Sequence, residues 1–178
     1  EYEYHFLMPK ERCREFAEQI LSHGQEYDIA SCRNEIIDVL MLEMRSVNQN
    51  KDIPEDVCPI QAGLHWMVDF SKEYLLGREF LMQEKKSPHR KLMALIFETE
   101  VEIPENAELY IEDIRVGFLV NQAFSPTMKK TIALAYIEER FGWVGIDFDV
   151  EALDKSRVPA KTVSSPLFLT RTIEEAGE

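Results

Sequence analysis

Leu-Met-Ala-Leu-Ile-Phe, at residues 92–97, is the first of six short apolar runs that decide how the second half of this chain folds. Each run has the length of one strand, and turn residues or prolines fall between many of them. The sequence after residue 91 shows no pattern of a long helix. We therefore predict a small antiparallel β-barrel or sandwich. The other five runs lie at residues 108–111, 116–120, 131–136, 146–150 and 158–163.

The residues before these runs follow mixed patterns. Residues 2–8 are aromatic and apolar, and they suit a buried strand that ends at Pro9. The apolar residues from Cys13 to Leu21 fall at helical spacing, and Gly24 is a typical stop signal. A second helix is expected around an apolar stripe made of Ile36, Ile37, Leu40, Met41 and Met44.

The middle of the chain contains a predicted boundary between two kinds of fold. Residues 48–56 read as a polar loop, residues 77–83 as a short helix and residues 85–91 as a linker. We therefore expect an α+β segment at residues 1–87, followed by an all-β segment at residues 88–178. The chain as a whole is predicted to belong to the α+β class.

The composition excludes several classes of partner. The chain has 178 residues, with 20 Lys and Arg against 33 Asp and Glu, and its formal net charge is −13. Such an acidic surface repels phosphate backbones, which argues against a nucleic-acid partner. No apolar run reaches the length of a membrane span, and the histidines lack metal-ligand spacing, so we expect neither a membrane partner nor a metal site. The three widely spaced cysteines indicate free thiols in the cytoplasm or another reducing compartment.

Three segments carry a resemblance to a known family. The first is Cys-Pro-Ile-Gln-Ala-Gly-Leu-His-Trp-Met-Val-Asp-Phe at residues 58–70, and the second is Leu-Gly-Arg-Glu-Phe-Leu at residues 76–81. The third is Phe-Ser-Pro-Thr-Met-Lys-Lys-Thr-Ile-Ala-Leu-Ala-Tyr at residues 124–136. In this order and spacing they resemble the glycine cleavage T-protein family. That family includes aminomethyltransferases, folate-linked demethylases and the folate domains of sarcosine and dimethylglycine dehydrogenases.

The resemblance extends from residue 1 to about residue 168 and implies a partial protein. It implies the carboxyl-terminal part of a folate-binding α/β domain, followed by the family's small antiparallel β-barrel. The implied cofactor is tetrahydrofolate, and the implied substrate is a small-molecule one-carbon donor. Full family members are longer, and the Asp regarded as catalytic lies in their amino-terminal portion. We therefore assign no catalytic residue to this chain, expect it to be inactive alone, and expect a missing amino-terminal half or a partner chain.

Three residues are candidates for contacting the folate. Glu1 falls where the resemblance places a Glu that accepts hydrogen bonds from pterin N–H groups, although it can also be read as a solvated terminal residue. Ile37 falls where the family has its folate-binding Arg, and an aliphatic side chain cannot replace that fork of donors. Arg33, one helical turn earlier, could reach the same pocket, or it is a surface residue near a helix start. Trp66 could stack on the pterin or pack between the two domains.

The sequence leaves three functions open. The first is the carboxyl-terminal portion of a tetrahydrofolate-dependent aminomethyl or methyl transferase. The second is a non-catalytic binding or assembly module that has lost the family Arg. The third is a β-barrel adaptor formed by residues 88–178, with the earlier residues as a docking platform.

Overall fold

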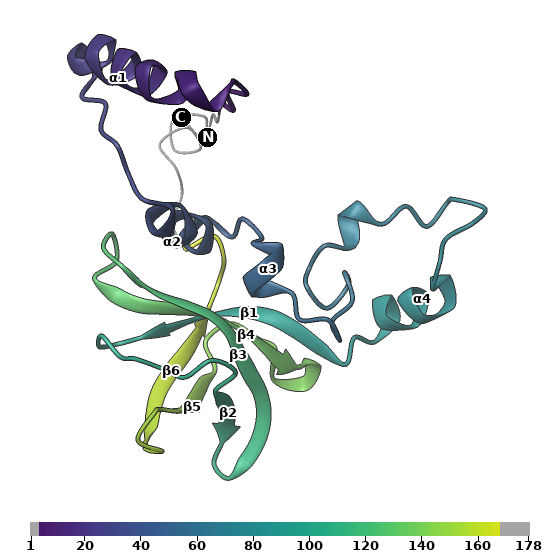
Figure 1. Cartoon of the computed structure of the whole chain (residues 1–178). Coiled ribbons are helices and arrows are strands. Elements are labelled where there is room, and N and C mark those ends of the chain that lie inside the picture. The colour runs from purple at the N-terminus through teal and green to yellow at the C-terminus, as the bar shows by residue number, and fades with distance from the viewer. Residues whose placement is uncertain (1–3, 168–178) are drawn as a thin grey trace, which may run out of the picture. The chain divides into compact units, whose positions relative to one another are not determined.

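The computed structural model describes residues 4–167 (Figure 1). The chain divides between Ile36 and Ile37 into two compact units. The first unit contains α1 (Cys13–His23), preceded by a 3-10 turn at Lys10–Arg12 and followed by another at Gln25–Tyr27. Gly24 is the C-cap residue of α1, and its N–H donates to the carbonyl of Ile20 at 2.9 Å. The predicted helix and its stop signal are both present.

The predicted strand at residues 2–8 is wrong for its described part. Residues 4–8 form no strand, and Tyr4, Phe6 and Leu7 are exposed. A strand needs a neighbour that pairs with its backbone N–H and C=O groups, and no described segment pairs with these residues. The apolar composition is used instead in a local contact, since the ring of Phe6 packs on that of Phe16 with centroids 4.9 Å apart.

The second unit is built on a closed antiparallel barrel of six strands (Figure 1). Their order around the barrel is β1-β4-β3-β2-β5-β6, and β6 pairs back with β1. All six predicted runs are strands, so the predicted small antiparallel barrel and the α+β class are confirmed. The strands are β1 (Arg90–Phe97), β2 (Glu108–Ile111), β3 (Ile114–Ser125), β4 (Lys130–Glu138), β5 (Asp147–Glu151) and β6 (Arg157–Val163).

Strand β4 is buried on both of its faces. Ala133, Ala135 and Ile137 belong to the main hydrophobic core, whereas Ile132 and Leu134 belong to a second cluster on the other face. A strand covered on both sides needs apolar residues at every position, not only at every second one. This explains the uninterrupted run Ile-Ala-Leu-Ala-Tyr-Ile at residues 132–137.

Helix α2 (Asn34–Met44) covers the second face of the barrel, but not with the predicted stripe. Its buried residues are Leu42, which packs in the second cluster, and Glu43. The Oγ of Ser125, at the end of β3, donates a hydrogen bond to the Glu43 carboxylate. This buried polar contact fixes the rotation of the helix. Three residues of the predicted apolar stripe are therefore exposed to solvent: Ile36, Ile37 and Leu40.

The predicted loop at residues 48–56 contains a helical turn, α3 (Gln49–Asp52). The side chain of Asn48 accepts a hydrogen bond from the N–H of Asn50 at 3.2 Å, and Asp52 accepts one from the N–H of Asn48 at 2.8 Å. These reciprocal contacts satisfy the free N–H groups at the start of the turn. Asp52 also accepts from Asn121 of β3 at 2.7 Å, and its carbonyl accepts from the Tyr136 hydroxyl at 3.0 Å. The turn is too short and too polar to show a helical period in sequence.

Helix α4 (Arg78–Lys86) lies where a short helix was predicted. It ends one residue before Ser87, and β1 begins at Arg90. The predicted linker at residues 85–91 is therefore divided between the end of a helix and the start of a strand. The division of the chain into domains at residues 1–87 and 88–178 stays a prediction.

We predict that Gly117→Ala destabilises the barrel. A Cβ at this position would lie 2.3 Å from the carbonyl oxygen of Tyr136, and a backbone atom of a paired strand cannot move aside. The free energy of unfolding should fall by about 1–3 kcal/mol, measured by chemical denaturation. Gly142→Ala is the matched control, because its Cβ would meet the flexible side chain of Lys91 at 3.2 Å. Equal stability of the two variants would contradict this account.

Candidate functional site

A concave pocket of about 970 Å³ lies between residues 45–53 and residues 57–67 of the second unit. We name it the Trp66 pocket. Its wall is mainly apolar, with contributions from Val57, Ala62 and Leu64, and Trp66 is part of its lining. None of the residues that line it is Asp or Glu, although the chain has 33 of these residues. Its size and lining are typical of a small-molecule site.

The turn at residues 59–64 shapes one wall of this pocket. The N–H of Leu64 donates to the carbonyl of Pro59 at 2.8 Å, and the N–H of Gly63 donates to Ile60 at 3.1 Å. This pair of bonds is the Schellman arrangement that ends a helical turn, and it requires a left-handed residue at the position of Gly63. Gly63 has φ +76°, which glycine adopts without strain. The Ala-Gly-Leu of the first resemblance segment is thus a chain reversal.

Trp66 lies in the 3-10 helix His65–Met67 that follows the turn. Its side chain is 73% exposed, and that of its neighbour Met67 is 65% exposed. A tryptophan so exposed contributes little to the core of this unit. It offers a flat aromatic face at the edge of the pocket.

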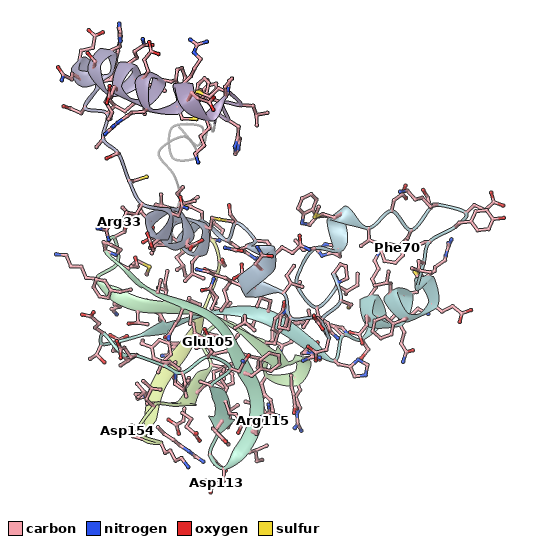
Figure 2. All side chains as sticks on the ribbon, viewed as in Figure 1. Arg33, Phe70, Glu105, Asp113, Arg115 and Asp154 are labelled. Carbon is pink, nitrogen blue, oxygen red and sulfur yellow. The ribbon has the colours of Figure 1, made fainter. Side chains whose placement is uncertain are left out.

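Of the other two predicted folate contacts, Arg33 and Glu1, the structure describes Arg33 alone. Arg33 is an exposed residue of the first unit, directly before α2 (Figure 2). Ile37, which the resemblance aligns with the folate-binding Arg of the family, lies in the first turns of α2 and is 46% exposed. Glu1 lies outside the described residues. A cofactor-binding role for Glu1, Arg33 and Trp66 stays a prediction.

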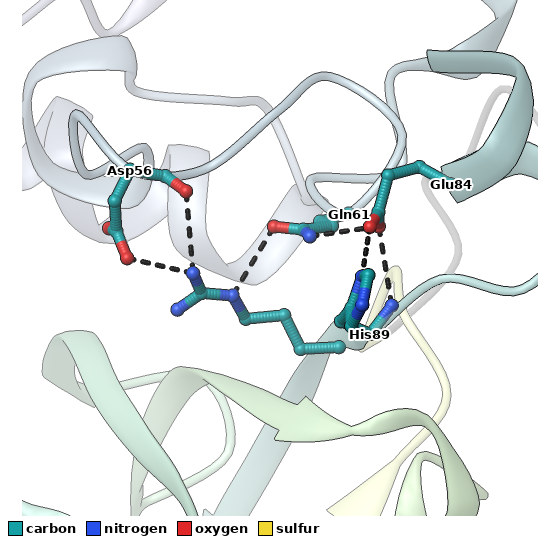
Figure 3. A network of polar contacts seen from close by, with 5 residues as sticks. Asp56, Gln61, Glu84 and His89 are labelled. Atoms are coloured by element: carbon teal, nitrogen blue, oxygen red, sulfur yellow. Dashed lines mark hydrogen bonds and ion pairs between the residues drawn. The ribbon is translucent and has the colours of Figure 1, made fainter. Parts of the chain in front are cut away.

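Outside the Trp66 pocket, a group of polar side chains links residues 56–61 to α4 and β1 (Figure 3). Gln61 donates to the buried carboxylate of Glu84 at 2.8 Å, and the backbone N–H of His89 donates to it at 3.2 Å. The ring of His89 contacts the other Glu84 oxygen. Arg90 donates to Gln61 at 3.3 Å and pairs with Asp56 at 2.7 Å.

This network is internally satisfied. Each of its charged groups has a partner within the network, and the guanidinium of Arg90 also lies 5.5 Å from the ring centroid of Phe118. Burial raises the pKa of Glu84, but hydrogen bonds from Gln61 and His89 outweigh burial and hold the net pKa below its ordinary value. The network therefore supports a structural role, joining α4 to the barrel.

Sequence reasoning missed two residues of these sites. Arg45 lines the Trp66 pocket, and Glu84 is the centre of the buried network. Arg45 stands in a polar stretch after a helix, and Glu84 is one of several charged residues in α4. Neither has a motif around it, and only the fold shows which of these charges is buried or faces a pocket.

Three further properties concern the described residues. Within residues 4–167, no three or more His, Cys, Asp or Glu side chains gather in a way that could hold a metal ion. None of the helices in that range has the length and apolar character needed to cross a membrane. The three cysteines are free thiols.

Comparison with known proteins identifies the barrel. Residues 90–168 match the family model described as "Glycine cleavage T-protein C-terminal barrel domain". This barrel belongs to the T-protein family. The structure is similar to the glycine cleavage system aminomethyltransferase T from Bartonella henselae, with a TM-score of 0.78 and 25% identity, over 90% of this chain and 45% of that one.

Curated T-protein relatives match most of the chain. An aminomethyltransferase of Bacillus velezensis is 31% identical over 153 residues, which cover 84% of this chain and 41% of the relative. An aminomethyltransferase of Halalkalibacterium halodurans is 28% identical over 152 residues, with the same two shares. The chain thus spans less than half the length of these relatives, and it corresponds to the carboxyl-terminal part of the T-protein.

We predict that Glu84→Gln lowers stability in a pH-dependent way. Because the folded pKa of Glu84 lies below its ordinary value of 4.5, its ionised form stabilises the folded state above that pH. This contribution is lost as the pH falls through the folded pKa. Wild type should exceed the variant by about 1–3 kcal/mol at pH 7, and by less below pH 4.5, in denaturation series from pH 3 to 7.

Glu105→Gln is the control for this series, since Glu105 is an exposed carboxylate outside the network (Figure 2). Its effect should be small at every pH. A Glu84→Gln effect that grows as the pH falls would show that the sign of the pKa shift is wrong.

Proposed function

We propose that this chain is the carboxyl-terminal portion of a tetrahydrofolate-dependent one-carbon transferase that moves an aminomethyl or methyl group. The observation that carries the proposal is the Trp66 pocket, which is lined in part by the first resemblance segment and contains no carboxylate. The family match of the adjoining barrel supports it. Tetrahydrofolate, when bound, supplies a nitrogen that accepts or donates the one-carbon unit.

The residues of the pocket fit part of such a cofactor. A pterin and an aminobenzoyl group are flat and aromatic, and Trp66 presents an exposed ring for stacking. A wall of Val57, Ala62 and Leu64 would exclude water from one side of the ligand. In this proposal the chain holds and orients the cofactor, while the proton-handling carboxylate belongs to the part of the protein outside this chain.

Several large apolar side chains between residues 66 and 82 are exposed, and this exposure supports the proposal that the chain is part of a larger protein. Leu76 is 98% exposed and Tyr74 is 87% exposed, and Met67 and Phe80 are also exposed in the same stretch of the chain. Monomeric proteins seldom leave such a concentration of large apolar side chains in water. We propose that the amino-terminal half of the protein covers these residues, in keeping with a chain that spans 41% of its curated relatives.

The alternative of a non-catalytic module rests on one residue. Ile37, at the position of the family Arg, offers no donor to a ligand carboxylate. The two functions differ in cofactor binding. Calorimetric titration of the full-length protein with tetrahydrofolate separates them, because saturable binding with transfer of the one-carbon unit is expected of the enzyme. No binding would support the module and contradict our proposal.

We predict that Trp66→Ala weakens tetrahydrofolate binding about three- to tenfold, since an aromatic contact is worth about 0.5–1.5 kcal/mol. Trp143→Ala is the matched control, because the chain has two tryptophans and Trp143 is 62% exposed and does not line the pocket. Both variants should keep wild-type unfolding curves. Equal affinity of the two variants would exclude stacking on Trp66. Arg33→Gln in the same titration tests a second predicted contact.

We predict that Leu76→Ser acts differently in the chain and in the full-length protein. In the isolated chain the side chain is already solvated, so the free energy of unfolding should change by about 0.5 kcal/mol or less. In the full-length protein the covered leucine should contribute about 1.5–3 kcal/mol. Leu153→Ser, at a 65% exposed position in the turn between β5 and β6, should be neutral in both. A neutral Leu76→Ser in the full-length protein would rule out coverage at this position.

A further inference from the structure

We infer that Arg45 is an anion-binding residue of the Trp66 pocket, which selects ligands that carry a carboxylate beside a flat aromatic group. This inference rests on the proposed function and deepens it, because it names the part of the ligand that Arg45 recognises. It does not rest on the family's folate-binding Arg, whose position is taken by Ile37.

Arg45 ends helix α2 in a conformation that favours glycine. The N–H of Ser46 donates to the carbonyl of Met41 at 2.8 Å, and the N–H of Arg45 donates to Leu42 at 3.4 Å. This is a second Schellman arrangement, with Arg45 at the left-handed position and φ +58°. An L-residue is strained there relative to glycine. Six non-glycine residues between positions 4 and 167 have positive φ, and Arg45 is the one among them that lines the Trp66 pocket.

The two chain reversals bring the guanidinium of Arg45 over Gly63. A Cβ built on Gly63 would lie 2.9 Å from Nη2 of Arg45, so the absence of a side chain at position 63 leaves room for the guanidinium. The chain reversal at Arg45 therefore supplies the cation, and the chain reversal at Gly63 supplies the space for it. Trp66 follows Gly63 by three residues and lines the same pocket.

The guanidinium of Arg45 has no ion pair or side-chain hydrogen bond among the described residues. Other pocket-lining cations of the second unit are paired: Arg90 with Asp56, Arg115 with Glu108 and Lys51 with Asp38. Arg45 also faces a pocket without carboxylates, in a chain whose net charge is −13. Among the described residues, therefore, no protein group competes with a ligand for this guanidinium.

A carboxylate on an aromatic ligand fits these features. A guanidinium forms two parallel hydrogen bonds with a carboxylate, a geometry that an ammonium group cannot reproduce. The apolar wall and Trp66 provide contact area for an aromatic ring. The aminobenzoylglutamate end of a folate has both groups.

The test is calorimetric titration of the 178-residue chain with p-aminobenzoylglutamate, its uncharged dimethyl ester and 6-methyltetrahydropterin. Arg45→Gln should lower affinity for the diacid about ten- to hundredfold, because it removes charge-assisted hydrogen bonds to the carboxylate. Affinity for the ester and the tetrahydropterin should not change. Arg45→Lys should restore only part of the loss, because a point charge replaces the fork.

Lys155→Gln is the matched control, since Lys155 is exposed, has φ +63° and lies outside the pocket. It removes one positive charge, as Arg45→Gln does, and should leave all three affinities unchanged. Arg45→Gly should weaken diacid binding and yet raise the melting temperature by about 2–4 °C, because glycine relieves the left-handed strain. A purely structural Arg45 would not give these opposite effects.

Several outcomes overturn the inference. These are wild-type affinity of Arg45→Gln for the diacid, an equal loss for diacid and ester, and no diacid binding by the wild-type chain. Failure of the proposed function gives a different result. Diacid binding that depends on Arg45, without tetrahydrofolate binding by the full-length protein, would keep the anion site and reject the folate-dependent transferase.

Discussion

The buried hydrogen bond between Ser125 and Glu43 fixes the part of the second unit that contains the Trp66 pocket. Ser125 ends β3, and its Oγ also accepts from the N–H of Met128 at 3.0 Å, which shapes the turn into β4. A buried carboxylate is costly unless it is hydrogen-bonded, so α2 is held in the one rotation that satisfies Glu43. The end of α2 is thereby fixed, and with it the backbone of Arg45.

A second set of polar contacts extends the same constraint. Asp52 accepts from Asn121 of β3, and its carbonyl accepts from Tyr136 of β4. Burial raises the pKa of Asp52 despite these bonds and that from Asn48, and it also raises the pKa of Tyr136. Residues 43–52 are thus attached at both ends to the barrel surface. The charged groups around Glu84 are bonded to one another, whereas the guanidinium of Arg45 has no such partner among the described residues and lines the Trp66 pocket.

Much of the fold was predictable from short-range patterns. The six strands were found because each is a compact apolar run between turn signals, and α1 because its period and Gly24 agree. The errors arose where a polar contact or an absent partner decides the structure. Among the described residues no strand lies beside residues 4–8, and α2 buries Glu43 instead of its predicted apolar stripe. The site was less predictable, since Trp66 was found through its segment, but the left-handed conformation of Arg45 has no sequence signal.

Closure of the barrel has a consequence for how the exposed apolar side chains of residues 66–82 behave in solution. Each strand is paired on both sides, so the sheet offers no free backbone edge to another molecule. A second copy of the chain therefore finds no barrel strand with an unpaired edge to which it could add a strand. Contact through the exposed side chains does not extend the sheet from one molecule to the next, which is the arrangement that builds cross-β fibres.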